Sequence, residues 1–241
     1  MSNTEAKLFA GTSGYSYPSW KPGFYPKNVP STKFLEYYAS RLNLVEVNYT
    51  FRQLAKAATF EKWVASTPAG FVFSPKAHNK ITHILRLKNA EEFTRVFLNT
   101  LAPIRDARRL GPILVQLPPS LKADGETLKQ FVRLLPKEDR FAFEFRHESW
   151  LADEIFSVLR DHNAALCLAE SEERETPEVI TADFVYFRLR KPEYSESEVK
   201  AIADKARRYQ ALGLNVYALF KHEERPAGAV CAERLLSASA A

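Results

Sequence analysis

The sequence predicts a single α/β domain, a (β/α)8 TIM barrel of parallel strands with helices outside. Three observations lead to this prediction. Short buried apolar runs recur along the chain, amphipathic stretches alternate with them, and the 241 residues approach the roughly 250 that one such barrel commonly takes. Parallel strands need crossover connections, which a helix between successive strands supplies. We expect one domain over residues 1–241, with its core at about 8–236.

Eight runs of β-branched or aromatic residues, bounded by Gly, Pro, Asn or polar residues, have the length and composition of buried strands. They are Leu8–Thr12, Leu44–Tyr49, Phe71–Ser74, Ile113–Leu117, Phe141–Phe145, Ala164–Ala169, Phe184–Leu189 and Val216–Phe220. An open doubly wound sheet is the alternative architecture, but the glycine-rich first turn that is typical of it is missing.

Amphipathic stretches between these runs predict helices, and Ser31, Asp124 and Ser195 are suitable N-caps for three of them. The predicted helices are Thr32–Leu42, Ala55–Ala65, Ala90–Arg105, Glu126–Leu135, Ala152–Arg160, Glu196–Leu212 and Gly228–Leu236. The segment after the sixth strand, Ser171–Ile180, is short and acidic and contains Pro177, so it predicts no clear helix.

Composition excludes several classes of protein but names no reaction. The hydrophobic fraction of 46% is enough for a sizeable core, and 34 Lys and Arg against 29 Asp and Glu permit an anionic partner without requiring one. The chain begins without a signal peptide and has no apolar run of membrane-spanning length, so we expect a cytoplasmic protein. Cys167 and Cys231 are expected to be reduced core thiols. Neither GxGxxG nor GxxxxGK[ST] is present.

Enzymes with this fold place their active sites at the carboxyl ends of the strands, so the polar residues there are the candidates. In the fifth strand the phenylalanines share one face, while Ala142, Glu144 and Arg146 share the other, because side chains alternate along a strand. The same alternation predicts an inward lining of Glu46, Asn48, Lys76, Gln116, Glu144, Arg146, Arg188 and Arg190. Further polar residues end the sixth and eighth strands, namely Glu170, Lys221 and His222.

The signs of these side chains suggest an anion site. Five cations at the mouth (Lys76, Arg146, Arg188, Arg190 and Lys221) outnumber three carboxylates (Glu46, Glu144 and Glu170). Arginine matches phosphate or carboxylate oxygens two at a time. Glu46 and Glu144 could act as general acid and base, with His147 in reserve. The alternative is a structural plug of mutually paired charges.

Two further features lie in the loops. The segment Gly14–Pro26 is rich in aromatic rings, and Tyr15, Trp20 and Trp150 could stack on a base or a sugar, although such a loop can also be a lid held by its own side chains. Four of the five histidines follow strands at the predicted mouth and could form a Zn²⁺ or Mn²⁺ site with Glu46 or Glu144. They are His78, His83, His147 and His222. Loop histidines are more often surface residues, and we favour no metal or cofactor.

Several ordered blocks carry a family resemblance. GTSGYSYPSWKPGFYP, LVEVNYTF, FVFSPKAHNKITH, LGPILVQLPPS, RFAFEFRHESW, VYFRLR and LFKHEERPAG resemble the domain of unknown function 72 family, the YecE-like proteins, from about Leu8 to Leu236. The resemblance implies a TIM barrel and no settled activity. Residues within family-like blocks are Glu46, Asn48, Lys76, His83, Gln116, Glu144, Arg146, His147, Trp150 and Arg188. The chain departs from the family pattern at Tyr15, Arg52, Glu170 and Arg190–Lys191.

The sequence as a whole favours a barrel whose mouth binds, and in one version hydrolyses, a phosphate-bearing ligand such as nucleic acid. Arg146, Arg188, Arg190 and Lys76 would hold the anion, and Glu144 and Glu46 would serve a hydrolase or lyase. A second hypothesis is a carbohydrate-active hydrolase that uses the two glutamates as its catalytic pair. A third is a non-catalytic ligand-binding or scaffold protein. Membrane partners are not expected, and the sequence leaves the oligomeric state open.

Overall fold

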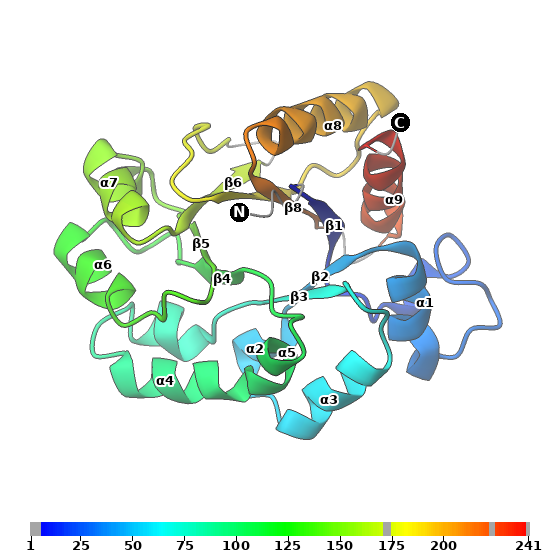
Figure 1. Ribbon diagram of the computed structural model, residues 1–241, viewed down its shortest axis with the longest axis horizontal. Coiled ribbons are helices and arrows are strands. Elements are labelled where there is room, and N and C mark those ends of the chain that lie inside the picture. Colours follow the sequence, from blue (N-terminus) through cyan, green and yellow to red (C-terminus); the bar gives the residue numbers. More distant parts are fainter. Residues whose placement is uncertain (1–5, 171–174, 222–224, 240–241) are drawn as a thin grey trace.

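Eight parallel strands form a nearly closed barrel with helices around it (Figure 1), as the sequence predicts. The computed structural model describes residues 6–170, 175–221 and 225–239. The strands are β1 (Leu8–Ser13), β2 (Leu44–Val47), β3 (Val72–Pro75), β4 (Ile113–Gln116), β5 (Phe141–Glu144), β6 (Ala165–Glu170), β7 (Phe184–Leu189) and β8 (Asn215–Phe220). Their order is β3-β2-β1-β8-β7-β6-β5-β4, so the first and last strands of the chain are neighbours.

The barrel is weakest between β3 and β4. In place of a continuous ladder, the described chain has two isolated parallel bridges here, Phe73 with Leu110 and Lys76 with Leu114. Elsewhere neighbouring strands pair continuously, and the β1–β2 pair is especially close. A Cβ atom at Gly11 would lie 1.8 Å from the backbone oxygen of Leu44, so only glycine fits at this contact.

Helices follow most of the strands and cover the outside of the barrel (Figure 1). In the described ranges they are α1 (Phe34–Arg41), α2 (Tyr49–Arg52), α3 (Ala57–Ala65), α4 (Glu91–Thr100), α5 (Ala102–Asp106), α6 (Gly125–Val132), α7 (Asp153–Asp161), α8 (Glu196–Ala211) and α9 (Ala227–Ser239). Asp124 and Ser195 cap α6 and α8 as predicted, each accepting a hydrogen bond from a backbone amide. None of the described helices is long and apolar enough to cross a membrane.

The structure corrects three local predictions. Ser31 is not a helix cap but the first residue of a 3-10 turn. The helix predicted over Ala90–Arg105 is two helices, because Pro103 in the first turn of α5 lacks the amide hydrogen that a continuous helix would use. The second strand ends at Val47 instead of Tyr49, and the chain turns at once into α2.

Two hydrophobic clusters show that the predicted alternation of side chains is correct. Ala142 faces the barrel interior, together with Leu44, Leu114, Ala165, Cys167, Phe184, Tyr186, Tyr217 and Leu219. Phe141, Phe143 and Phe145 belong to the larger core between strands and helices. Cys167 and Cys231 are both buried free thiols, which agrees with the sequence-based expectation. The apolar interior fills the barrel and leaves its polar residues at the carboxyl end of the sheet.

Candidate functional site

A layer of buried charged side chains lies directly above the apolar interior. Strand register places Ser13, Glu46 and Ser74 level with one another on β1, β2 and β3, and Gln116 level with Glu144 on β4 and β5. Arg188 projects from β7 on the other side of the barrel. Glu46, Glu144 and Arg188 are 0%, 1% and 1% exposed. Charges buried to this degree need partners, and these residues find them in one another.

Arg188 connects the two glutamates. Its Nε lies 2.9 Å from Glu46 Oε2 and its Nη2 lies 2.6 Å from Glu46 Oε1, while Nη1 pairs with Glu144 Oε2. Ser13 and Tyr186 donate their hydroxyl hydrogens to Glu46 at 2.8 and 3.1 Å. Glu46 therefore accepts hydrogen bonds on both of its oxygens, and its partners are all fully buried.

Glu144 divides its two oxygens between different partners. Oε2 accepts from Arg188 and, at 2.8 Å, from Gln116 Nε2. Oε1 accepts from Arg146 Nε at 3.1 Å and from Arg190 Nη1 at 3.3 Å. Burial alone would raise the pKa of Glu144, but Arg188, Arg146 and the other donors outweigh it and lower the pKa to about 2. Glu144 is therefore ionised at neutral pH, which argues against its predicted use as a general acid.

Half-buried cations form the rim above this layer. The side chains of Arg146 and Arg190 are 29% and 28% exposed. Lys76 donates from Nζ to Gln116 Oε1 at 2.8 Å and lies 4.1 Å from the centre of the Phe51 ring. Burial, together with Arg188 and Arg146, lowers the pKa of Lys76 to about 8 in spite of Glu46 and Glu144.

His83 contacts the same aromatic ring. Its ring packs edge-on against Phe51 with the centroids 5.1 Å apart, and its Nδ1 is 2.8 Å from Thr82 Oγ1. Burial and the nearby cations Lys76 and Arg146 lower the pKa of His83. The neutral imidazole is thus favoured at the rim.

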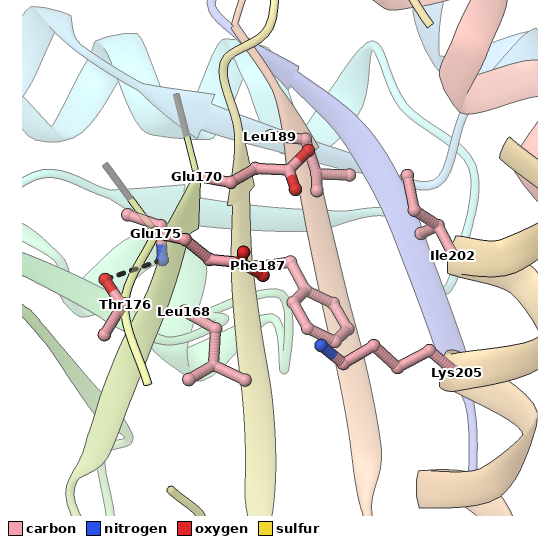
Figure 2. Close-up of a pocket in the computed structure, with 9 residues that line it drawn as sticks. Leu168, Glu170, Glu175, Thr176, Phe187, Leu189, Ile202 and Lys205 are labelled. Carbon is pink, nitrogen blue, oxygen red and sulfur yellow. Dashed lines mark hydrogen bonds between the residues drawn. The ribbon is translucent and has the colours of Figure 1, made fainter. Parts of the chain in front are cut away.

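Glu170 does not belong to this site, contrary to the sequence-based expectation. It shares the outer face of β6 with Leu168, and Figure 2 shows both residues beside Phe187, Leu189 and Lys205 in a small pocket between the sheet and α8. Tyr194 donates its hydroxyl hydrogen to Glu170 Oε1 at 2.6 Å. The described mouth therefore has two central carboxylates rather than the predicted three.

Two of the three predicted stacking residues are part of the hydrophobic core. Trp20 is 0% exposed and packs against Phe24 and Tyr25. Trp150 is 1% exposed, stacks on Phe145 with centroids 4.8 Å apart, and donates from Nε1 to the Leu121 carbonyl at 2.7 Å. Neither indole has a face open to a ligand, because neighbouring side chains cover both.

The other predicted residues lie around the mouth with varied surroundings. Tyr15 is half-buried with its ring near Tyr38 and Trp63, and burial raises its pKa to about 12. His147 accepts the amide hydrogen of Ser149 on Nδ1, so it caps a short 3-10 turn. Two half-buried residues directly follow strands: Asn48 follows β2 and begins α2, and Lys221 follows β8. The predicted His222 lies outside the described residues.

Sequence reasoning assigned no role to four residues that the structure places around the charged layer. Ser13, Ser74 and Tyr186 have the inward alternation of their strands, which could have identified them, and Ser74 Oγ lies 2.9 Å from the Tyr186 hydroxyl. Phe51 gave no such signal because it lies on α2, which the sequence did not predict. Among the described residues, no group of three or more His, Cys, Asp or Glu side chains could hold a metal ion.

Comparison with known proteins places this chain in a family. The model of the family described as "Protein of unknown function DUF72" matches residues 9–241. The chain is 29% identical over 138 residues to the UPF0759 protein YunF of Bacillus subtilis and over 146 residues to the UPF0759 protein YecE of Escherichia coli. These segments cover 55% and 60% of this chain, but only 49% and 50% of the two relatives, so the match spans about half their length.

Solved structures agree over the whole chain. A DUF72 family protein from Thermotoga maritima superposes with a TM-score of 0.84 at 25% identity, covering 96% of this chain and 98% of its own. A DUF72 family protein from Enterococcus faecalis gives a TM-score of 0.76 at 17% identity, with 96% and 97% covered. The second likeness shows the fold alone.

Proposed function

The chain belongs to the DUF72 family of proteins of unknown function, and we propose that the mouth of its barrel binds a phosphate-bearing ligand. The observation that carries this proposal is the charge of the described mouth. Lys76, Arg146, Arg188 and Arg190 bring four cationic side chains to two carboxylates, Glu46 and Glu144. A bound anion would neutralise part of this excess of positive charge.

The two rim arginines are the best candidates for direct contact with the phosphate. Arg146 and Arg190 both reach Glu144 Oε1, so their guanidinium groups converge at one point while a quarter or more of each side chain is exposed. Arg190 uses only one of its five N–H donors, on Nη1, in its contact with Glu144. Arg188 has a different role from the one predicted, because it is buried beneath Glu144 and holds the rim in place instead of touching the ligand.

Hydrolysis through the two glutamates finds no support in the geometry. Arg188 lies between Glu46 and Glu144 and binds both. Glu144 is deprotonated at neutral pH because its pKa is about 2. The paired-carboxylate mechanism of glycoside hydrolases needs one carboxyl group that can donate a proton. We therefore propose binding of a phosphate group and leave the glutamates a structural role.

A thermal-shift titration tests the proposal. Inorganic phosphate, a phosphorylated sugar and a 5′-phosphorylated oligonucleotide are compared with their unphosphorylated counterparts, because a ligand that binds only the folded protein raises its melting temperature. The Arg190→Gln variant should lose most of the shift, and Arg95→Gln on the exposed surface of α4 should keep it. Equal shifts in Arg190→Gln and the native chain, or no shift with any phosphate, would contradict the proposal.

A further inference from the structure

Lys76 differs from the other cations at the mouth. Arg146, Arg188 and Arg190 each have a glutamate oxygen within 4 Å. The structure, over the residues it describes, gives Lys76 no such carboxylate. Its Nζ instead contacts a neutral amide, Gln116 Oε1, and the face of Phe51. A largely buried lysine held in this way lacks the close counter-ion that would offset the loss of water around its ammonium group.

The wider surroundings of Lys76 contain charges of both signs. The charged and titratable groups that face it are Glu46 on β2, Glu144 on β5, Arg146 just after β5, Arg188 on β7 and His83 in the segment after β3. Both glutamates are already paired with Arg188, so their attraction for Lys76 is largely offset. With burial, the pKa of Lys76 falls to about 8. Desolvation and a neighbouring cation are the two means by which proteins make a lysine nucleophilic.

We propose that Lys76 is a reactive amine, and that the phosphate-bearing ligand of this site carries an aldehyde or ketone that Lys76 takes up as an imine. This inference rests on the proposed phosphate site and adds the chemical class of its ligand. The neutral Nζ attacks the carbonyl carbon and forms a C–N bond while the C=O π bond opens, and a proton passes from the nitrogen to the oxygen to give a carbinolamine. The C–O bond then breaks, the oxygen leaves as water with the second proton of the nitrogen, and the C=N bond remains, so no oxidant or reductant is needed.

A chain of hydrogen bonds links Lys76 to the arginines of the rim. Lys76 Nζ binds Gln116, Gln116 binds Glu144, and Glu144 binds Arg146 and Arg190. The amine and the rim guanidinium groups are thus separated by one short chain of hydrogen-bonded side chains. A ligand with its carbonyl at Lys76 and its phosphate at the arginines would bridge this chain. The cationic rim would also hold the phosphate close while the imine forms.

Trapping with borohydride tests the inference on the whole protein. Pyridoxal 5′-phosphate supplies an aldehyde and a phosphate, and pyridoxal supplies the aldehyde alone. Each is used at less than one equivalent near pH 7.5, borohydride converts any imine to a stable amine, and peptide mapping locates the adducts. A pKa near 8 instead of 10.4 makes the neutral fraction of the amine larger by roughly a hundredfold, so Lys76 should be labelled at least about tenfold faster than surface lysines.

Lys80 is the matched internal control, because it is exposed on the same segment and also lies over an aromatic ring, that of Phe93. Selective labelling of Lys76, faster with pyridoxal 5′-phosphate and slowed by inorganic phosphate, supports both the inference and the phosphate site. Equal labelling of Lys76 by both reagents, without protection by phosphate, supports the reactive amine but overturns the phosphate-bearing ligand. Labelling of Lys76 no faster than Lys80 overturns the reactive amine.

Two measurements separate failure of the inference from failure of the phosphate site. The Lys76→Arg variant cannot form an imine and should lose the adduct, which confirms where the adduct lies, while the thermal shift of the native chain with inorganic phosphate tests the phosphate site by itself. If the native chain shows that shift but no selective adduct at Lys76, the reactive amine is wrong and the phosphate site stands.

Discussion

Replacing Arg188 by Met should cost the protein about 4 kcal/mol of stability, which would show that this residue is structural. The guanidinium group is 1% exposed and makes three close contacts with two glutamates that are themselves 0% and 1% exposed. Removing one partner of a buried ion pair typically costs about 3–5 kcal/mol, because the other charge stays buried without compensation. Glu144 keeps Arg146 and Arg190 in the variant, so most of the loss should come from Glu46.

Urea unfolding at equilibrium measures this loss, and for a chain of this size it corresponds to a decrease in melting temperature of about 10 °C. A second variant tests the assignment to Glu46. Adding Glu46→Gln to Arg188→Met should recover about 2 kcal/mol or more, since the amide removes the buried charge, accepts a hydrogen bond from one of the two hydroxyl groups of Ser13 and Tyr186, and can donate to the other.

Two results would refute this reasoning. The first is an unfolding free energy of Arg188→Met within about 1 kcal/mol of the native chain at neutral pH, which would mean that the charges are not buried together as described. The second is a double variant less stable than Arg188→Met alone, which would mean that the negative charge of Glu46 is not the source of the deficit.

Three further predictions concern stability. The pKa of Glu144 is about 2 in the folded chain against 4.5 ordinarily, so its ionised form should stabilise the fold by about 3 kcal/mol. This contribution should be complete above pH 4.5 and be lost as the pH falls towards 2. The urea midpoint of Glu144→Gln should therefore depend less on pH than that of the native chain. Trp150→Phe loses the hydrogen bond to Leu121 and should lower the free energy of unfolding in urea by about 1 kcal/mol. Trp150→Ala also loses the stack on Phe145 and should lower it by about 3–5 kcal/mol. Equal losses in the two variants would contradict this packing. Gly11→Ala should lower the unfolding free energy by about 3 kcal/mol or more, because its Cβ would overlap the backbone of β2, and native-like stability would show that the strands can move apart.

The alternation of side chains along each strand predicted the inner lining of the barrel. One face of each strand points into the barrel and the other packs against the helices, so alternate residues separate into two sets. Glu46, Gln116, Glu144 and Arg188 all lie where the alternation places them. Glu170 was misplaced because it was assigned by its position at a strand end alone. It has the same parity as Leu168, which packs in the outer core, so the alternation would have placed it outside the mouth.

Other features depend on contacts that no local pattern contains. Arg188 meets Glu46 across 142 positions of sequence, so the choice between a ligand site and a structural plug required the strand register. Aromatic composition predicted rings near the first loop but could not say whether they face a ligand or one another, and Trp20 is enclosed by its neighbours. The short helix α2 arises where Thr50 donates to the backbone oxygens of Val47 and Lys76, a tertiary contact that ends the strand early.

The charged mouth has two layers that meet at Glu144. The inner layer fits the interpretation as a structural plug, and the rim fits the interpretation as a ligand site. Glu144 Oε2 faces inward and binds Arg188 and Gln116, while its Oε1 faces the rim and binds Arg146 and Arg190. The inner layer contains enough partners to be stable without a ligand. At the rim, one carboxylate oxygen accepts from two guanidinium groups while Arg188 draws on the same negative charge. Glu144 therefore holds the two arginines close together in fixed orientations, which lowers the cost of ordering them around an incoming phosphate.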